Sequence, residues 1–89
     1  MKKSLSISIF GRVHGVGFRY HALNKAEEMG INGFIRNEQD GSVFIEAEGE
    51  EASIDEFVDW CRQGPRWASV DSIEIKSIEP RNYRAFSVK

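Results

Sequence analysis

The sequence has only one cysteine, no long apolar run and no excess of positive charge. A single cysteine, Cys61, cannot form an internal disulfide, so we expect a reducing, cytoplasmic compartment. No apolar segment is long enough for a secretion signal or a membrane span, so we expect neither, and no membrane partner. The formal net charge of −2 argues against a nucleic-acid partner, since such a partner usually requires a basic excess.

The rest of the composition is typical of one small folded unit. The chain has 89 residues, of which 40% are hydrophobic, and this is enough for one compact core. It contains no repeats, no low-complexity tract and no stretch that resembles a linker. We therefore expect a single domain over residues 1–89, with a monomer as the default state.

Alternation of apolar and polar residues predicts the strands. Leu5, Ile7 and Ile9 alternate with serines, which is typical of a strand with one buried face. The Asp40-Gly41 pair is a turn signal between two further strands. The expected strands are residues 4–9, 31–37, 42–48, 70–78 and 83–88.

Two segments have the apolar spacing of helices that bury one face. The first is residues 18–29, and Gly30 follows it as a stop signal. In the second helix the apolar residues fall at i, i+3, i+4 and i+7, namely Ile54, Phe57, Val58 and Cys61. The element order is then β-α-β-β-α-β with a short terminal strand. This order predicts an α/β (α+β) fold in which two helices cover one face of an antiparallel sheet.

Residues 10–19 join the first predicted strand to the first helix and contain three glycines and two arginines. Glycines allow a tight turn that points successive N–H groups inward, and a helix N-terminus adds free N–H groups and a positive dipole end. Arg19, at the start of the helix, could turn its guanidinium back over the loop to meet a phosphoryl group. The spacing matches neither GxxxxGK[ST] nor GxGxxG, so a loop with only a structural role is an open alternative.

Asn37 is a second candidate, at the predicted end of the strand that follows the first helix. Its carboxamide can accept a hydrogen bond from a water molecule and donate one to a neighbouring oxygen. This would suit it to hold a nucleophilic water without acting as a base. The alternative is that Asn37 only begins the turn, as asparagines often do.

Together, these segments resemble the acylphosphatase family. The first is similar to the pattern G-x-V-x-G-V-x-F-R, and it is formed here by Gly11, Val13, Gly15, Val16, Phe18 and Arg19. The second is similar to G-[FW]-[VI]-x-N followed by a turn and G-[ST]-V, and it is formed here by Gly33, Phe34, Ile35, Asn37, Gly41, Ser42 and Val43. The likeness continues through Gly64-Pro65, Val70-Asp71 and residues 83–86, so it covers nearly the whole chain.

The resemblance implies a ferredoxin-like sandwich and an enzyme that hydrolyses the carboxyl–phosphate bond of small acyl phosphates. It implies no metal and no cofactor. The family's phosphate-binding arginine falls on Arg19, and its water-positioning asparagine falls on Asn37. The substrate-binding segment, which acts mainly through its backbone, is His14, Gly15, Val16, Gly17, Phe18 and Arg19. His14 stands where many members carry glutamine, and this departure affects the implied function little.

Other polar and aromatic residues have simpler interpretations. A general-base role for His14 or His21 is less favoured than a loop position and a helix-surface position. Four acidic residues are expected to form a solvated edge rather than a cation site, namely Glu46, Glu48, Glu50 and Glu51. Cys61 is expected to be a buried, inert thiol, and Trp60 and Trp67 are expected to be packing residues.

Two other functions stay open at this point. A non-catalytic binding module could use the same element order, because fold does not fix function. RNA-binding domains of this topology stack bases on aromatic residues, for which Phe10 and Phe44 are candidates, but Glu46 and Glu48 would repel the phosphates. Acylphosphatase-like domains also occur within larger maturation proteins, and the length of this chain argues against that interpretation.

Overall fold

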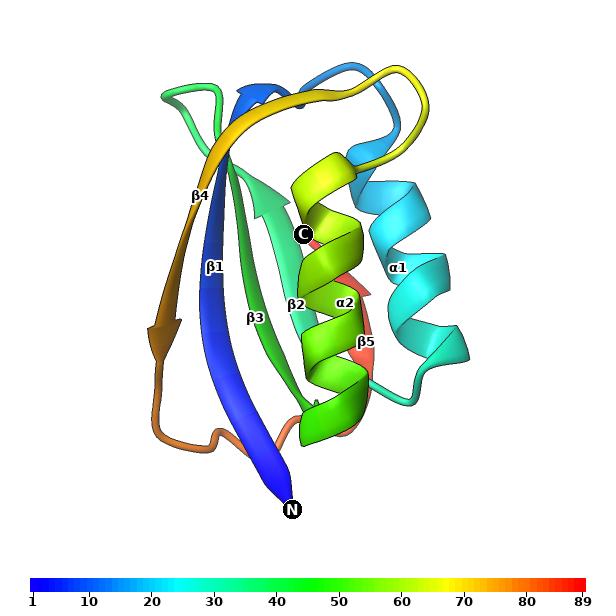
Figure 1. Cartoon of the computed structure of the whole chain (residues 1–89), viewed down its shortest axis with the longest axis vertical. Coiled ribbons are helices and arrows are strands. Elements are labelled where there is room, and N and C mark those ends of the chain that lie inside the picture. The colour runs from blue at the N-terminus through cyan, green and yellow to red at the C-terminus, as the bar shows by residue number, and fades with distance from the viewer.

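The computed structural model describes all 89 residues, which form a five-stranded sheet with two helices packed on one of its faces (Figure 1). The strands are β1 (Lys2–Arg12), β2 (Asn32–Asn37), β3 (Val43–Glu50), β4 (Ser69–Ser77) and β5 (Phe86–Val88), and the helices are α1 (Phe18–Glu28) and α2 (Glu51–Gln63). The predicted element order and the ferredoxin-like sandwich are confirmed. Neither helix has the length and apolar character that a membrane crossing requires.

The sheet is mixed, so the expectation of an antiparallel sheet is wrong for one strand. The strand order is β4-β1-β3-β2-β5, and β5 pairs in parallel with β2 while the other neighbours are antiparallel. β4 and β5 lie at opposite edges, and the connecting chain crosses the sheet near the end at which β1 begins and β3 ends (Figure 1). β5 therefore starts from the same end of the sheet as β2 and runs in the same direction. Alternation within a strand does not indicate which edge that strand will join.

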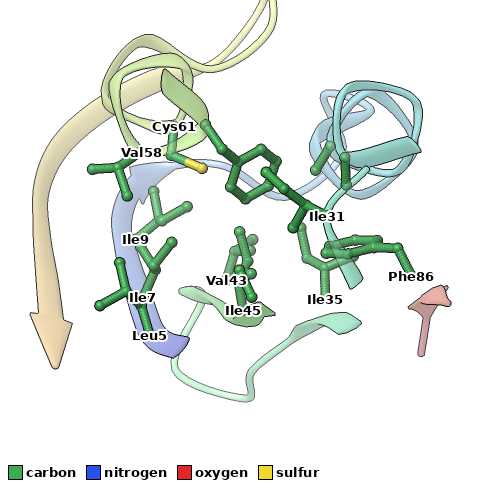
Figure 2. Close-up of a cluster of buried hydrophobic side chains, with 14 of the residues drawn as sticks. Leu5, Ile7, Ile9, Ile31, Ile35, Val43, Ile45, Val58, Cys61 and Phe86 are labelled. Atoms are coloured by element: carbon green, nitrogen blue, oxygen red, sulfur yellow. The ribbon is translucent and has the colours of Figure 1, made fainter. Parts of the chain in front are cut away.

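The core lies between the sheet and the two helices (Figure 2). Leu5, Ile7 and Ile9 of β1 are at most 4% exposed, and Ile7 pairs directly with Ile45 of β3. The predicted face of α2 is also buried, namely Ile54, Phe57, Val58 and Cys61. Burial raises the pKa of the Cys61 thiol, so the thiol stays protonated and inert, as predicted. Each large side chain buried in this way contributes about 1.5–3 kcal/mol.

The two tryptophans have different environments. The Trp60 ring packs edge-on against Phe18 at 5.4 Å between centroids and stacks on Phe57 at 6.1 Å, as expected of a packing residue. Trp67 is 70% exposed, so the same expectation is wrong there. Trp67 lies in the connection between α2 and β4, outside the helices and strands that enclose the core. Trp67 instead faces solvent, with the Arg66 guanidinium 5.1 Å from its ring centroid.

Glu48 anchors the connection that carries the chain from β4 to β5. Its carboxylate accepts hydrogen bonds from the Ser4 hydroxyl (3.2 Å) and from the backbone N–H groups of Tyr83 (3.0 Å), Asn82 (3.3 Å) and Arg81. Burial would raise the pKa of Glu48, but these hydrogen bonds hold it below its ordinary value. The expectation of a solvated acidic edge is therefore wrong for this residue.

Glu46 supports the same connection from the next position on that face of β3. Its carboxylate accepts a 2.5 Å hydrogen bond from the Tyr83 hydroxyl and lies 3.5 Å from the Arg81 guanidinium. Burial and the hydrogen bond to Glu46 raise the pKa of Tyr83 to about 12. Residues 81–83 bond to Glu46 and Glu48 instead of pairing with β2, and the predicted terminal strand therefore begins only at Phe86.

Replacing Glu48 with alanine should lower the free energy of unfolding by about 1–2 kcal/mol at about pH 7, because several N–H donors lose a charged acceptor. The folded-state pKa of Glu48 is below its unfolded-state value of about 4.3. The stabilisation is therefore present above that value and is lost as the pH falls through the folded-state pKa. Urea denaturation of both proteins at about pH 7 and about pH 3 measures the difference.

Glu50→Ala is the matched control for this experiment. The Glu50 side chain is 59% exposed and pairs only with the Met1 amino group, at 3.2 Å, so its loss should cost less than about 0.5 kcal/mol. Equal losses in the two variants would contradict the anchoring role. A loss in Glu48→Ala that is the same at both pH values would contradict the role of the ionised carboxylate.

Candidate active site

The loop between β1 and α1, residues 13–17, is held at both ends by buried side chains; we refer to it as the glycine loop. Val13 is 1% exposed, and Phe18, the first residue of α1, is 2% exposed. Gly15 and Gly17 have φ values of 71° and 77°, a left-handed conformation that costs a side-chain-bearing residue about 1–2 kcal/mol. A Cβ at Gly15 would meet nothing within 4 Å, so conformation rather than space requires glycine there.

The backbone N–H groups of the glycine loop and of the first turn of α1 are free to bind an anion. No backbone N–H group from His14 to Tyr20 donates to a backbone carbonyl oxygen. The first such hydrogen bond runs from the His21 N–H to the Gly17 carbonyl oxygen, at 3.0 Å. Gly17 is the N-cap and provides no side-chain hydrogen bond, and the first turn holds no acidic residue. The positive end of the helix dipole is therefore not neutralised within the chain.

Arg19 and Asn37 line one hollow of about 400 Å³ beside the glycine loop. Both side chains are half-buried, one in the first turn of α1 and the other at the end of β2. Asn37 lies on the same face of β2 as Ile35, which points into the core beneath the helices. The Arg19 guanidinium donates from Nη1 to the Lys89 carbonyl oxygen, at 2.9 Å. This contact fixes the guanidinium near the end of β5.

The hollow contains most of the predicted site residues. It is lined by Gly15, Gly17, Phe18, Arg19 and Asn37, while His14 and Val16 are not among its lining residues. Sequence reasoning missed four further lining residues, namely Val13, Tyr20, Leu23 and Val88. Helix spacing could have indicated Leu23, which follows Arg19 by four positions, but not Tyr20, because adjacent helical residues do not share a face. No local signal could have indicated Val88, since its place depends on the pairing of β5 with β2.

The His14 side chain pins the glycine loop to the turn between β2 and β3. Its Nε2–H donates to the Ser42 carbonyl oxygen at 2.8 Å, and the proton is assigned to Nε2 because a carbonyl oxygen can only accept. Ser42 is held in turn by Asp40, whose carboxylate accepts from the Ser42 hydroxyl (2.6 Å) and N–H (2.9 Å). These two hydrogen bonds lower the pKa of Asp40. His21 is exposed on α1, as expected of a helix-surface residue.

No three His, Cys, Asp or Glu side chains come together in a way that could hold a metal ion. Among the four acidic residues considered above, Glu46 and Glu48 hold the connection before β5, and Glu50 pairs with the Met1 amino group. The candidate site is a hollow that brings together free backbone N–H groups, one guanidinium and one carboxamide.

The family model described as Acylphosphatase matches residues 5–88. The chain belongs to the acylphosphatase family. A relative named Acylphosphatase from Mannheimia succiniciproducens is 52% identical over 82 residues, which is 91% of each chain. A second relative named Acylphosphatase, from Archaeoglobus fulgidus, is 44% identical over 85 residues, which is 96% of each chain.

A solved structure is also similar to this member of the acylphosphatase family over its full length. The crystal structure of acylphosphatase from Bacillus subtilis has a TM-score of 0.95 and 32% identity, and the match covers 100% of this chain and 99% of that one. The match therefore spans the positions of both sequence blocks. The resemblance found in the two sequence blocks therefore extends to the whole fold.

Gly15→Ala should lower the free energy of unfolding by about 1–2 kcal/mol, because alanine is strained at a φ of 71°. Relief of that strain displaces loop N–H groups, so the affinity for inorganic phosphate should fall about tenfold. Urea denaturation and calorimetric titration with phosphate measure the two effects.

Gly30→Ala is the matched control, because Gly30 has a φ of 69°, a Cβ added there would meet nothing within 4 Å, and the residue lies at the opposite end of α1. It should lose similar stability and keep its phosphate affinity. Equal weakening of phosphate binding in both variants, or none in Gly15→Ala, would show that the glycine loop is not the anion site.

Proposed function

We propose that this acylphosphatase-family chain hydrolyses the carboxyl–phosphate bond of small acyl phosphates to a carboxylate and phosphate, without a metal or cofactor. The observation that carries the proposal is that one hollow, at the N-terminus of α1, is lined by Arg19, Asn37, Gly15 and Gly17 together. Family membership and the names of full-length relatives support an enzyme of this type. The residue roles below are inferred from the chemistry of the groups in the hollow.

The phosphoryl group is bound by the free N–H groups of residues 14–19 and by the Arg19 guanidinium. N–H groups at a helix N-terminus and a planar guanidinium are both well suited to phosphoryl oxygens. Arg19 uses one N–H on the Lys89 carbonyl oxygen, and a guanidinium has five, so donors remain for the substrate. The Lys89 contact thus holds the arginine in place before the substrate arrives.

The attacking water is positioned by Asn37. The carboxamide oxygen accepts a hydrogen bond from the water, and the NH₂ group can donate to a phosphoryl oxygen. The water oxygen forms a bond to phosphorus while the bond from phosphorus to the acyl oxygen breaks, and the acyl group leaves as a carboxylate. A carboxylate is a good leaving group that needs no proton, and a phosphoryl oxygen of the substrate accepts the proton of the water. The protein's part is positioning and charge stabilisation.

The cellular setting proposed for this reaction follows from composition. Residues 1–89 act as one acylphosphatase-like domain and as a monomer, with a small-molecule acyl phosphate as substrate and inorganic phosphate as product. The single, buried Cys61 favours a reducing, cytoplasmic compartment. The net charge of −2 disfavours a nucleic-acid partner.

The contacts of Phe44 further disfavour RNA binding. The Arg36 guanidinium lies 4.9 Å from the Phe44 ring centroid, and the Phe34 ring lies 5.9 Å from it. A base stacking on Phe44 would have to displace Arg36. The neighbouring Glu46 and Glu48 place negative charge on the same side of β3.

Arg19→Ala and Asn37→Ala should each lower the rate of benzoyl phosphate hydrolysis about 100- to 1,000-fold, because each removes a preorganised group that acts in the transition state. Wild-type activity should be unchanged by EDTA, because no step uses a metal. The decay of benzoyl phosphate absorbance, followed with and without EDTA, measures both.

Arg62→Ala and Asn24→Ala are the matched controls, since both residues are exposed on helices and neither lines the hollow. They should retain wild-type rates. Near-normal turnover by both Arg19→Ala and Asn37→Ala would contradict the proposed roles. Loss of wild-type activity in EDTA would contradict the metal-free reaction.

A further inference from the structure

The hollow has an apolar wall that the phosphoryl chemistry does not use. This wall is formed by Tyr20 and Leu23 of α1 and Val88 of β5. Tyr20 is 67% exposed and Val88 is 42% exposed, so two of the five exposed large hydrophobic side chains of the molecule line the same hollow. Apolar groups that gather beside a few polar groups are typical of small-molecule sites.

The wall begins next to the groups that bind the phosphoryl group. Tyr20 follows Arg19 directly, and Leu23 lies one helical turn beyond Arg19 on the same side of α1. Val88 pairs with Ile35, so it is on the helix-covered face of the sheet, and its neighbour Lys89 accepts the hydrogen bond from Arg19. No acidic side chain lines the hollow. A substrate anchored on Arg19 would therefore have its non-phosphoryl part against an apolar surface.

We propose that Tyr20, Leu23 and Val88 bind the acyl group, and that the enzyme selects acyl phosphates with an aromatic or other apolar acyl group over those with a very small one. This inference rests on the proposed function. Tyr20 and Leu23 come from α1, and Val88 comes from β5, the strand next to β2, which carries Asn37.

The test compares kcat/KM for benzoyl phosphate and acetyl phosphate, which present the same reacting group on acyl groups of different size. The wild type should favour benzoyl phosphate. Tyr20→Ser and Val88→Thr should each lower kcat/KM for benzoyl phosphate about tenfold and change that for acetyl phosphate less than about twofold. Both side chains are exposed, so these variants should fold, and thermal unfolding checks that they do.

Trp67→Ser is the matched control, because Trp67 is an aromatic residue of similar exposure, 70%, that lies outside the hollow. It should leave the ratio of the two kcat/KM values unchanged. An equal change for both substrates in Tyr20→Ser and Val88→Thr would overturn the inference, and so would a shift of the ratio in Trp67→Ser. Absence of hydrolysis of either substrate by the wild type would instead overturn the proposed function itself.

Discussion

Burial of the Phe18 ring fixes the place where the glycine loop becomes helix α1. The ring is 2% exposed and packs edge-on against Trp60 of α2 at 5.4 Å between centroids. A Cβ at Gly64 would come within 2.7 Å of the same ring, so the end of α2 is also shaped around it. The free N–H groups of the first turn and the Arg19 side chain take their positions from this contact. Precise placement of such groups is the main requirement of phosphoryl transfer.

The start of α1 is suited to binding rather than to helix stability. A serine or aspartate N-cap would satisfy one of the free N–H groups, and an acidic residue in the first turn would complement the dipole. Here the N-cap is Gly17 and no acidic residue follows it. In α2, by contrast, Glu51 lies in the first turn and Arg62 in the last, and both charges complement the helix dipole. The N-terminus of α1 is thus left free for a bound anion.

The other half of the hollow depends on the contacts that bring β5 beside β2. Glu48 and Glu46 hold residues 81–83 at one end of the sheet, and β5 then runs parallel to β2 toward Arg19. The position of β5 in turn brings the Lys89 carbonyl oxygen to the Arg19 guanidinium and the Val88 side chain into the same hollow. The two carboxylates therefore act on the site from a distance, through the position of a strand.

The sequence by itself determined the element order, the buried faces of β1 and α2, and the two segments that carry Arg19 and Asn37. These features are local, because a period of two or 3.6 residues and a glycine in a tight turn depend only on near neighbours in the chain. Only the tertiary structure decided that Arg19 and Asn37 share a hollow and that Val88 forms part of its wall. It also decided the parallel pairing of β5, the exposure of Trp67 and the hydrogen bonding of Glu48 to residues 81–83. Each of these depends on which edge or surface is still free when distant segments meet, and the periodicity of a single segment does not contain that information.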